Sequence, residues 1–176
     1  MKEINTRIDF FKDRPGMVIA ELGVFTGLFS RELLTCNPDM LVLVDIWEGP
    51  MSSGVNDDEN DVIRIADMSR VYKEIVKEFK GKNIDIYRGR STDFLQAIED
   101  DSLDCVYIDT DHAFEQTRNE LNLSRDKVKP GGWITGHDYN MGGVRDAVDS
   151  FCQLNGLEIN YLSKDKFVSY YIKNLK

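Results

Sequence analysis

The sequence predicts an α/β domain with a doubly wound, mostly parallel sheet of about seven strands and helices on both faces. Short apolar runs alternate with amphipathic stretches along most of the chain, which is typical of β-α-β units. The tail differs, because two strand-like runs flank a polar turn there and predict a C-terminal antiparallel hairpin. A chain of 176 residues suits one core, so we expect a single domain over residues 1–176.

The predicted elements follow this alternation from the first apolar run onward. Each strand is a short run of mainly aliphatic residues, and each helix carries its apolar residues at helical spacing. The expected strands are 17–22, 41–46, 84–87, 103–108 and 133–135, followed by the hairpin strands within 157–162 and 167–173. The expected helices are 28–36, 62–79, 92–98, 114–128 and 144–154.

Two segments lie outside this alternation. Residues 1–16 form an N-terminal segment that lacks the apolar core of a signal peptide. Residues 48–61, "EGPMSSGVNDDEND", form a polar loop after the second strand. A loop of this length is often functional, and this one follows a strand on the side where α/β folds bind ligands. Both a lid over a ligand and a solvated acidic loop fit its composition.

Charge and cysteine content exclude several classes of protein. Acids outnumber bases 31 to 22, for a net charge of -9, which argues against charge-driven binding to nucleic acid or to an anionic membrane. The three cysteines, Cys36, Cys105 and Cys152, form no CxxC pair, so we expect buried reduced thiols rather than a zinc site or disulfides. No apolar run is long enough to span a bilayer. We therefore expect a soluble cytoplasmic protein.

The turn after the first strand indicates a nucleoside ligand. The stretch "ELGVFTG" has glycines at Gly23 and Gly27 but places Phe25 where a dinucleotide site needs glycine for the pyrophosphate. The second strand ends in Asp45, 22 residues after Gly23, where an acid can bind ribose hydroxyls. A nucleoside without pyrophosphate fits, and S-adenosylmethionine is such a ligand. Glu21, directly or through water, can meet its cationic end.

The chain resembles the class I S-adenosylmethionine-dependent methyltransferases, in particular a small branch similar to metal-dependent sugar and natural-product O-methyltransferases. The resemblance covers the chain from about residue 17 and rests on "AELGVFTG", "LVLVDIW", "YRGRSTDFL", "VYIDTDHAFEQTRNEL", "KPGGWITGHDYN" and "GVRDAVDSF". It implies a Rossmann-like fold and a cofactor site in which the glycine turn holds the methionine part. It places Asp45 on the ribose, Ile46 beside the adenine, and Ser91 near the adenine amino group.

Acids and both histidines follow the fourth and fifth predicted strands. They are Asp109, Asp111, His112, His137 and Asp138. Because parallel strands end at one edge of a sheet, we expect these side chains to meet near the glycine turn. Methyl transfer to oxygen needs alignment and a deprotonated nucleophile, and histidine titrates near neutrality. We therefore expect His112 to act as the base, with His137 as the alternative and Asp109 beside the reacting groups.

The resemblance also implies that a metal site is one possibility. In related enzymes an acid at the position of Asp109 binds magnesium, together with two adjacent acidic or amide residues after the fifth strand. This chain departs from that pattern, because the adjacent pair is His137-Asp138. Magnesium prefers oxygen ligands, and histidine shifts the preference toward manganese, iron or zinc. A divalent metal (Mg or Mn) on Asp109, His137 and Asp138 is one alternative, and a site without metal is the other.

The predicted function is methyl transfer from S-adenosylmethionine to a small-molecule acceptor, at a hydroxyl oxygen, without nucleic acid or membrane partners. A nicotinamide-dependent oxidoreductase is a second reading, which the missing phosphate glycine argues against. A non-catalytic module that kept the fold is a third reading. The sequence does not identify the acceptor, and it leaves a homo-oligomer open.

Overall fold

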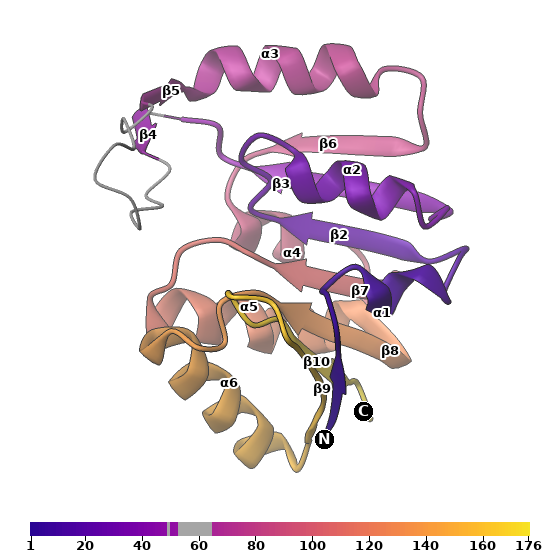
Figure 1. The fold of residues 1–176 in the computed structure, drawn as a ribbon, viewed down its shortest axis with the longest axis vertical. Coiled ribbons are helices and arrows are strands. Elements are labelled where there is room, and N and C mark those ends of the chain that lie inside the picture. Colours follow the sequence, from indigo (N-terminus) through magenta and orange to yellow (C-terminus); the bar gives the residue numbers. More distant parts are fainter. Residues whose placement is uncertain (49, 53–64) are drawn as a thin grey trace.

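The computed structural model of the chain describes residues 1–48, 50–52 and 65–176 (Figure 1). The described strands are β1 (Lys2–Ile4), β2 (Val18–Leu22), β3 (Met40–Asp45), β4 (Pro50–Ser52), β5 (Ile65–Asp67), β6 (Ile84–Arg88), β7 (Leu103–Ile108), β8 (Val128–Gly136), β9 (Ile159–Ser163) and β10 (Tyr170–Lys173). The described helices are α1 (Asp9–Lys12), α2 (Leu28–Leu34), α3 (Met68–Phe79), α4 (Ser91–Ala97), α5 (Phe114–Lys127) and α6 (Gly142–Asn155).

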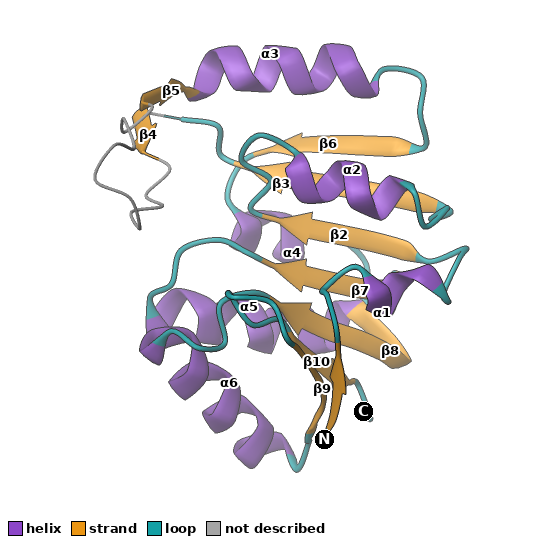
Figure 2. Ribbon diagram, viewed as in Figure 1, coloured by secondary structure: helices purple, strands orange, loops and turns teal. Residues whose placement is uncertain are grey.

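Eight of the described strands form the main sheet, in the order β1-β9-β10-β8-β7-β2-β3-β6 (Figure 2). All neighbouring strands run parallel except β10, which is antiparallel to both β8 and β9. This confirms the predicted doubly wound, mostly parallel sheet and its C-terminal hairpin. The eighth strand, β1, was not predicted. It comes from the N-terminal segment and pairs with β9 at the edge of the sheet.

Helices cover both faces of the sheet and enclose two apolar clusters. On one face, α1, α2 and α3 pack side chains such as Phe11, Leu33 and Phe79 against the sheet. On the other face, α4, α5 and α6 contribute side chains such as Leu95 and Phe151. Alternate residues of a strand point to opposite faces, so an apolar strand that is buried on both sides joins the two clusters. The cysteines are free and buried, as predicted.

The helix predicted over 62–79 differs from the structure in the described residues. The predicted helix over 62–79 begins only at Met68, because the Asp67 carboxylate caps α3 by accepting from the backbone N–H groups of Ser69 and Arg70. Within the same predicted helix, Ile65–Asp67 forms a strand that pairs antiparallel with Pro50–Ser52. The predicted lid over 48–61 lies outside the described residues at position 49 and from position 53 onward.

The strand order fixes where a ligand can bind. The chain runs from the central strand β2 outward through β3 to β6, and it then returns to β7 on the other side of β2. In open α/β sheets, ligands bind beyond the carboxyl ends of the strands at this switch in direction. The turn after β2 and the loop after β7 therefore flank the candidate site.

Candidate active site

The glycine turn after β2 is shaped by a close approach of the backbone. Gly23 has a φ of +88°, and a Cβ atom there would lie 1.9 Å from the carbonyl oxygen of Asp109. Gly27, with a φ of +75°, stands directly before α2, and a Cβ atom there would lie 2.6 Å from Cδ1 of Ile75. Gly23 requires glycine because the blocking atom belongs to the backbone, whereas at Gly27 the positive φ favours glycine and the Ile75 side chain could move aside. The first one brings the turn after β2 against the loop after β7.

Asp45 at the end of β3 holds this turn in place. Its Oδ2 accepts hydrogen bonds from the N–H groups of Val24 (2.9 Å) and Phe25 (2.8 Å), and its Oδ1 accepts from the N–H of Trp47 (2.8 Å). A carboxylate offers about four lone-pair sites, so one remains for a ligand hydroxyl. The next side chain, Ile46, is 45% exposed and offers an apolar surface beside that position.

Glu21 is a buried acid at the inner side of the same turn. Its side chain is 2% exposed and accepts a 2.5 Å hydrogen bond from the Ser30 hydroxyl on α2. Burial raises the pKa of Glu21 to about 8, and the hydrogen bond from Ser30 opposes this shift only in part. Glu21 is therefore mainly protonated at pH 7, so it can ionise when a cationic ligand group approaches.

Ser91, which the resemblance places near the adenine amino group, is buried and engages its hydroxyl with other side chains. Its Oγ donates to the carboxylate of Glu120, a fully buried acid on α5. The Glu120 carboxylate also accepts from Oγ1 of Thr110 and Nε2 of Gln116, each at 2.8 Å. Glu120 thus connects the first residue of α4 with the loop after β7.

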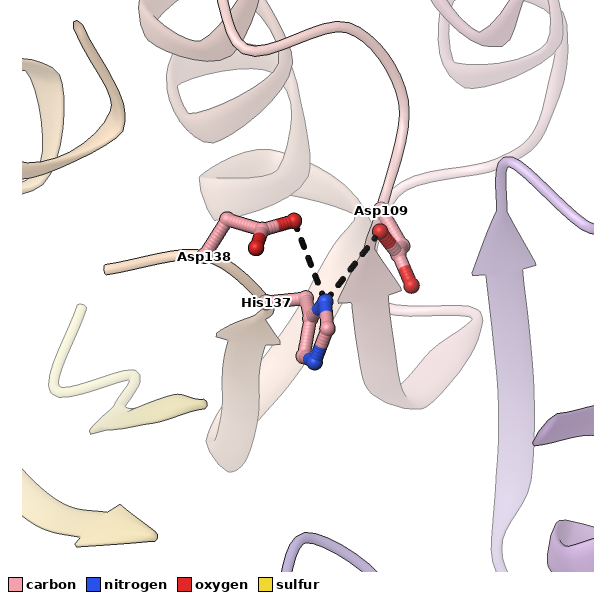
Figure 3. Close-up of side chains that lie close together, drawn as sticks. All are labelled: Asp109, His137 and Asp138. Carbon is pink, nitrogen blue, oxygen red and sulfur yellow. Dashed lines mark hydrogen bonds and ion pairs between the residues drawn. The ribbon is translucent and has the colours of Figure 1, made fainter. Parts of the chain in front are cut away.

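The loops after β7 and β8 bring the predicted chemical groups together (Figure 3). Nδ1 of His137 lies 3.1 Å from Oδ2 of Asp138 and 3.5 Å from Oδ1 of Asp109. The same Oδ2 of Asp138 lies 2.8 Å from Nε2 of His112. These four side chains line part of a pocket at the edge of the sheet. Asp111 lines the same pocket, and its Oδ1 accepts a hydrogen bond from the N–H of Ala113.

The charges of this cluster depend on its hydrogen bonds. Burial by itself would lower the pKa of His137, but hydrogen bonds and charge from Asp109 and Asp138 outweigh burial and raise it to about 9. For Asp138, burial would raise the pKa, yet contacts with His137 and His112 lower it. At neutral pH, His137 is therefore protonated and Asp138 is ionised. The half-exposed His112 shares Asp138 with it.

The same side chains could hold a metal ion. Asp109, His137 and Asp138 each offer one ligand atom, and these atoms lie within 4.8 Å of one another. Two carboxylate oxygens and one imidazole nitrogen fit a divalent cation, and the nitrogen favours manganese, iron or zinc over magnesium. Nδ1 of His137 faces both carboxylates, so a cation there would replace the proton that this nitrogen otherwise carries.

Two residues near the site were not predicted from the sequence. Arg7 in the N-terminal segment places its guanidinium 3.7 Å from Oδ2 of Asp109. No sequence pattern marks a single arginine ahead of a short helix as a residue of a binding site. Glu120 did have a signal, because it shares the buried face of α5 with Thr117, Leu121 and Ser124. A charged residue on a buried helix face usually has partners.

Comparison with known proteins identifies the fold and the family. A sequence profile of the family described as a methyltransferase domain matches residues 20–139. No curated protein sequence matches the chain. Among described residues, no helix has the length and apolar character needed to cross a membrane.

Solved structures with the same fold act on different acceptors. The O-methyltransferase NovP has a TM-score of 0.65 at 18% identity, over 97% of this chain and 80% of that chain. An rRNA methylase from Streptococcus thermophilus has a TM-score of 0.62 at 10% identity, over 96% and 94%. Fibrillarin from Aeropyrum pernix, with natively bound S-adenosyl-L-methionine, has a TM-score of 0.62 at 15% identity, over 92% and 68%. At these identities the likeness shows the fold alone. Together with the profile match, it shows that the chain belongs to the methyltransferase domain family and has the class I fold of S-adenosylmethionine-dependent methyltransferases.

Proposed function

We propose that the chain transfers the methyl group of S-adenosylmethionine to a hydroxyl oxygen of a small-molecule acceptor. The observation that carries this proposal is the His112–Asp138 pair, which stands beside Asp109 at the edge where the glycine turn would hold the cofactor. Methyl transfer from a sulfonium is an in-line displacement, which requires an aligned oxygen that loses its proton. A histidine oriented by a carboxylate is suited to taking that proton.

The proposed roles follow from the contacts of each residue. The backbone of residues 23–27 holds the methionine part, the free lone pair of Asp45 accepts from the ribose, and Ile46 packs on the adenine. His112 hydrogen-bonds Asp138 through Nε2, which leaves Nδ1 to accept the acceptor's proton. His137 is a poor base at neutral pH, since it is already protonated. It holds Asp109 and Asp138 in place instead.

A divalent cation is a second candidate for activating the hydroxyl, and the donor set of Asp109, His137 and Asp138 supports it. When bound, such an ion would lower the pKa of the acceptor hydroxyl. Chelation distinguishes the two routes. If His112 alone removes the proton, methyl transfer survives EDTA and fails in His112→Ala. If a cation is required, EDTA abolishes transfer, and manganese restores it better than magnesium.

The acceptor class is proposed from charge. A net charge of -9 disfavours a polyanionic acceptor such as RNA, although the fold is also that of an rRNA methylase. Incubation with S-adenosylmethionine carrying a labelled methyl group tests this, with a pool of hydroxylated metabolites in one arm and total RNA in the other. We expect label in the metabolite arm. Label confined to RNA would refute the small-molecule acceptor, and no turnover in either arm, despite cofactor binding, would favour the non-catalytic module.

A further inference from the structure

The N-terminal segment carries an arginine to the edge of the site and holds it there. The backbone N–H of Arg7 donates to Oδ2 of Asp165 at 2.6 Å, and its carbonyl oxygen accepts from the Tyr171 hydroxyl at 2.7 Å. Three residues further on, the Phe10 ring stacks on Tyr171 with centroids 4.3 Å apart. The backbone of Arg7 is thus fixed to β10 and to the turn that precedes it.

The guanidinium of Arg7 lies against the glycine turn and the loop after β7. It stands 4.1 Å above the ring of Phe29, the second residue of α2. Its distance of 3.7 Å to Oδ2 of Asp109 is an ion contact that is too long for a hydrogen bond. The side chain is 21% exposed. The guanidinium also interacts with the Tyr107 hydroxyl, but it has five N–H donors in a planar fork, so Arg7 retains donors for a planar anion.

Arg7 is complemented by an acid on the same side of the turn. The positive charge of Arg7 favours the ionised form of Glu21 and lowers its pKa, although less than burial raises it, and Glu21 is held by Ser30 of α2. The amino-acid end of S-adenosylmethionine carries one ammonium and one carboxylate. A site for such a zwitterion needs an acidic group for the ammonium and a cationic group for the carboxylate. Glu21 and Arg7 supply one of each.

We propose that Arg7 binds the carboxylate of the amino-acid end of the cofactor, an inference that rests on the proposed methyl-transfer function. Its guanidinium would turn from Asp109 to this carboxylate and donate two parallel hydrogen bonds. Release of Asp109 from the ion contact would then leave that acid to the acceptor side of the site. The N-terminal segment would thereby complete the cofactor site.

Calorimetric titration with S-adenosylhomocysteine and with its decarboxylated analogue tests this assignment. Hydrogen bonds to a charged group contribute about 1.5 to 3 kcal/mol, so Arg7→Ala should weaken S-adenosylhomocysteine about 10- to 100-fold. The analogue lacks the carboxylate and should bind the wild type and Arg7→Ala alike. Arg7→Lys keeps the charge without the fork and should show a smaller loss, which also decides the matter if Arg7→Ala does not fold.

Arg14→Ala is the matched control. Arg14 also belongs to the N-terminal segment and stands 4.1 Å above a phenylalanine ring, that of Phe10, so its removal should leave both affinities unchanged. Unchanged affinity of Arg7→Ala for S-adenosylhomocysteine, or equal losses for both ligands, would overturn the assignment. Failure of the wild type to bind S-adenosylhomocysteine would instead refute the proposed function itself.

Discussion

Two buried acids at the same edge of the sheet have opposite pKa shifts. Glu21, in the glycine-turn region (residues 21–30), has its pKa raised to about 8, because its burial is opposed mainly by one serine hydroxyl. Asp138, in the histidine–acid region (residues 109–112 and 137–138), has its pKa lowered despite burial, because two histidines contact it. Burial therefore does not decide the charge of a site residue. The contacts of Asp138 favour its ionised form, whereas burial favours the neutral form of Glu21.

The largest loss of stability should follow from a substitution at Gly23, where the glycine-turn region touches the histidine–acid region. Gly23→Ala places a methyl group on the backbone of Asp109, which no side-chain rotation can relieve. We expect the free energy of unfolding to fall by upward of about 4 kcal/mol, measured by urea denaturation. Gly81→Ala is the control, since Gly81 has a similar φ of +80° but open space around it. It should cost only about 1 to 2 kcal/mol.

The second effect is a pH dependence of stability from Glu21. Because its folded pKa of about 8 exceeds the unfolded value near 4.5, the folded state binds more protons between these values. The contribution of Glu21 to the free energy of unfolding is thus fully present below about pH 4.5 and is lost as the pH rises through about 8. At about 1.4 kcal/mol per pKa unit, the loss is roughly 3 to 5 kcal/mol.

Urea denaturation of Glu21→Gln at pH 5 and pH 8.5 isolates this contribution. The variant should lose less stability than the wild type between the two pH values, because glutamine does not ionise. If both proteins lose the same free energy of unfolding between pH 5 and pH 8.5, Glu21 is already ionised in the folded state. The contrast with Asp138 would then disappear.

The third effect concerns the protonation of His137. Imidazole NMR titration of the wild type should give a pKa of about 9 for this residue. In Asp138→Asn, only Asp109 remains to oppose burial, so the value should fall by about one to two units. The chain has only two histidines, so His112→Gln identifies the second signal. A pKa for His137 that does not respond to Asp138→Asn would show that Asp109 alone sets its charge.

The smallest effect should come from the buried link between α4 and the loop after β7. Glu120→Gln replaces one acceptor oxygen by a donor in front of hydroxyls from Ser91 and Thr110. We expect a loss of about 1 to 2 kcal/mol in thermal unfolding. Glu115→Gln changes an acid that is 67% exposed on the same helix and should stay within about 0.5 kcal/mol. Equal effects at both positions would argue against the link.

The fold was predictable because its signals are local. Alternating apolar runs and amphipathic stretches determine the parallel sheet, and the convergence of Asp109, His137 and Asp138 follows from parallel strands that end at one edge. Strand β1 was missed because it is an exposed edge strand of three residues, with no apolar alternation to mark it.

The parts that could not be predicted depend on contacts between distant segments. The hydrogen bond from the Ser91 hydroxyl to Glu120 joins two different helices, and no spacing in the sequence indicates it. Arg7 reaches Asp109 across about a hundred positions of sequence, and its place depends on contacts of the N-terminal segment with Asp165 and Tyr171 near the other end of the chain. The protonated state of Glu21 depends on how deeply its side chain is buried, and the spacing of residues in the sequence does not indicate this.

The most direct test of the central claim is a crystal structure of the protein with S-adenosylhomocysteine bound. The account predicts the homocysteine part over residues 23–27, the ribose on Asp45, and the sulfur facing the pocket that Asp109, His112 and Asp138 help to line. Binding elsewhere, or a sulfur that faces away from these side chains, would contradict it.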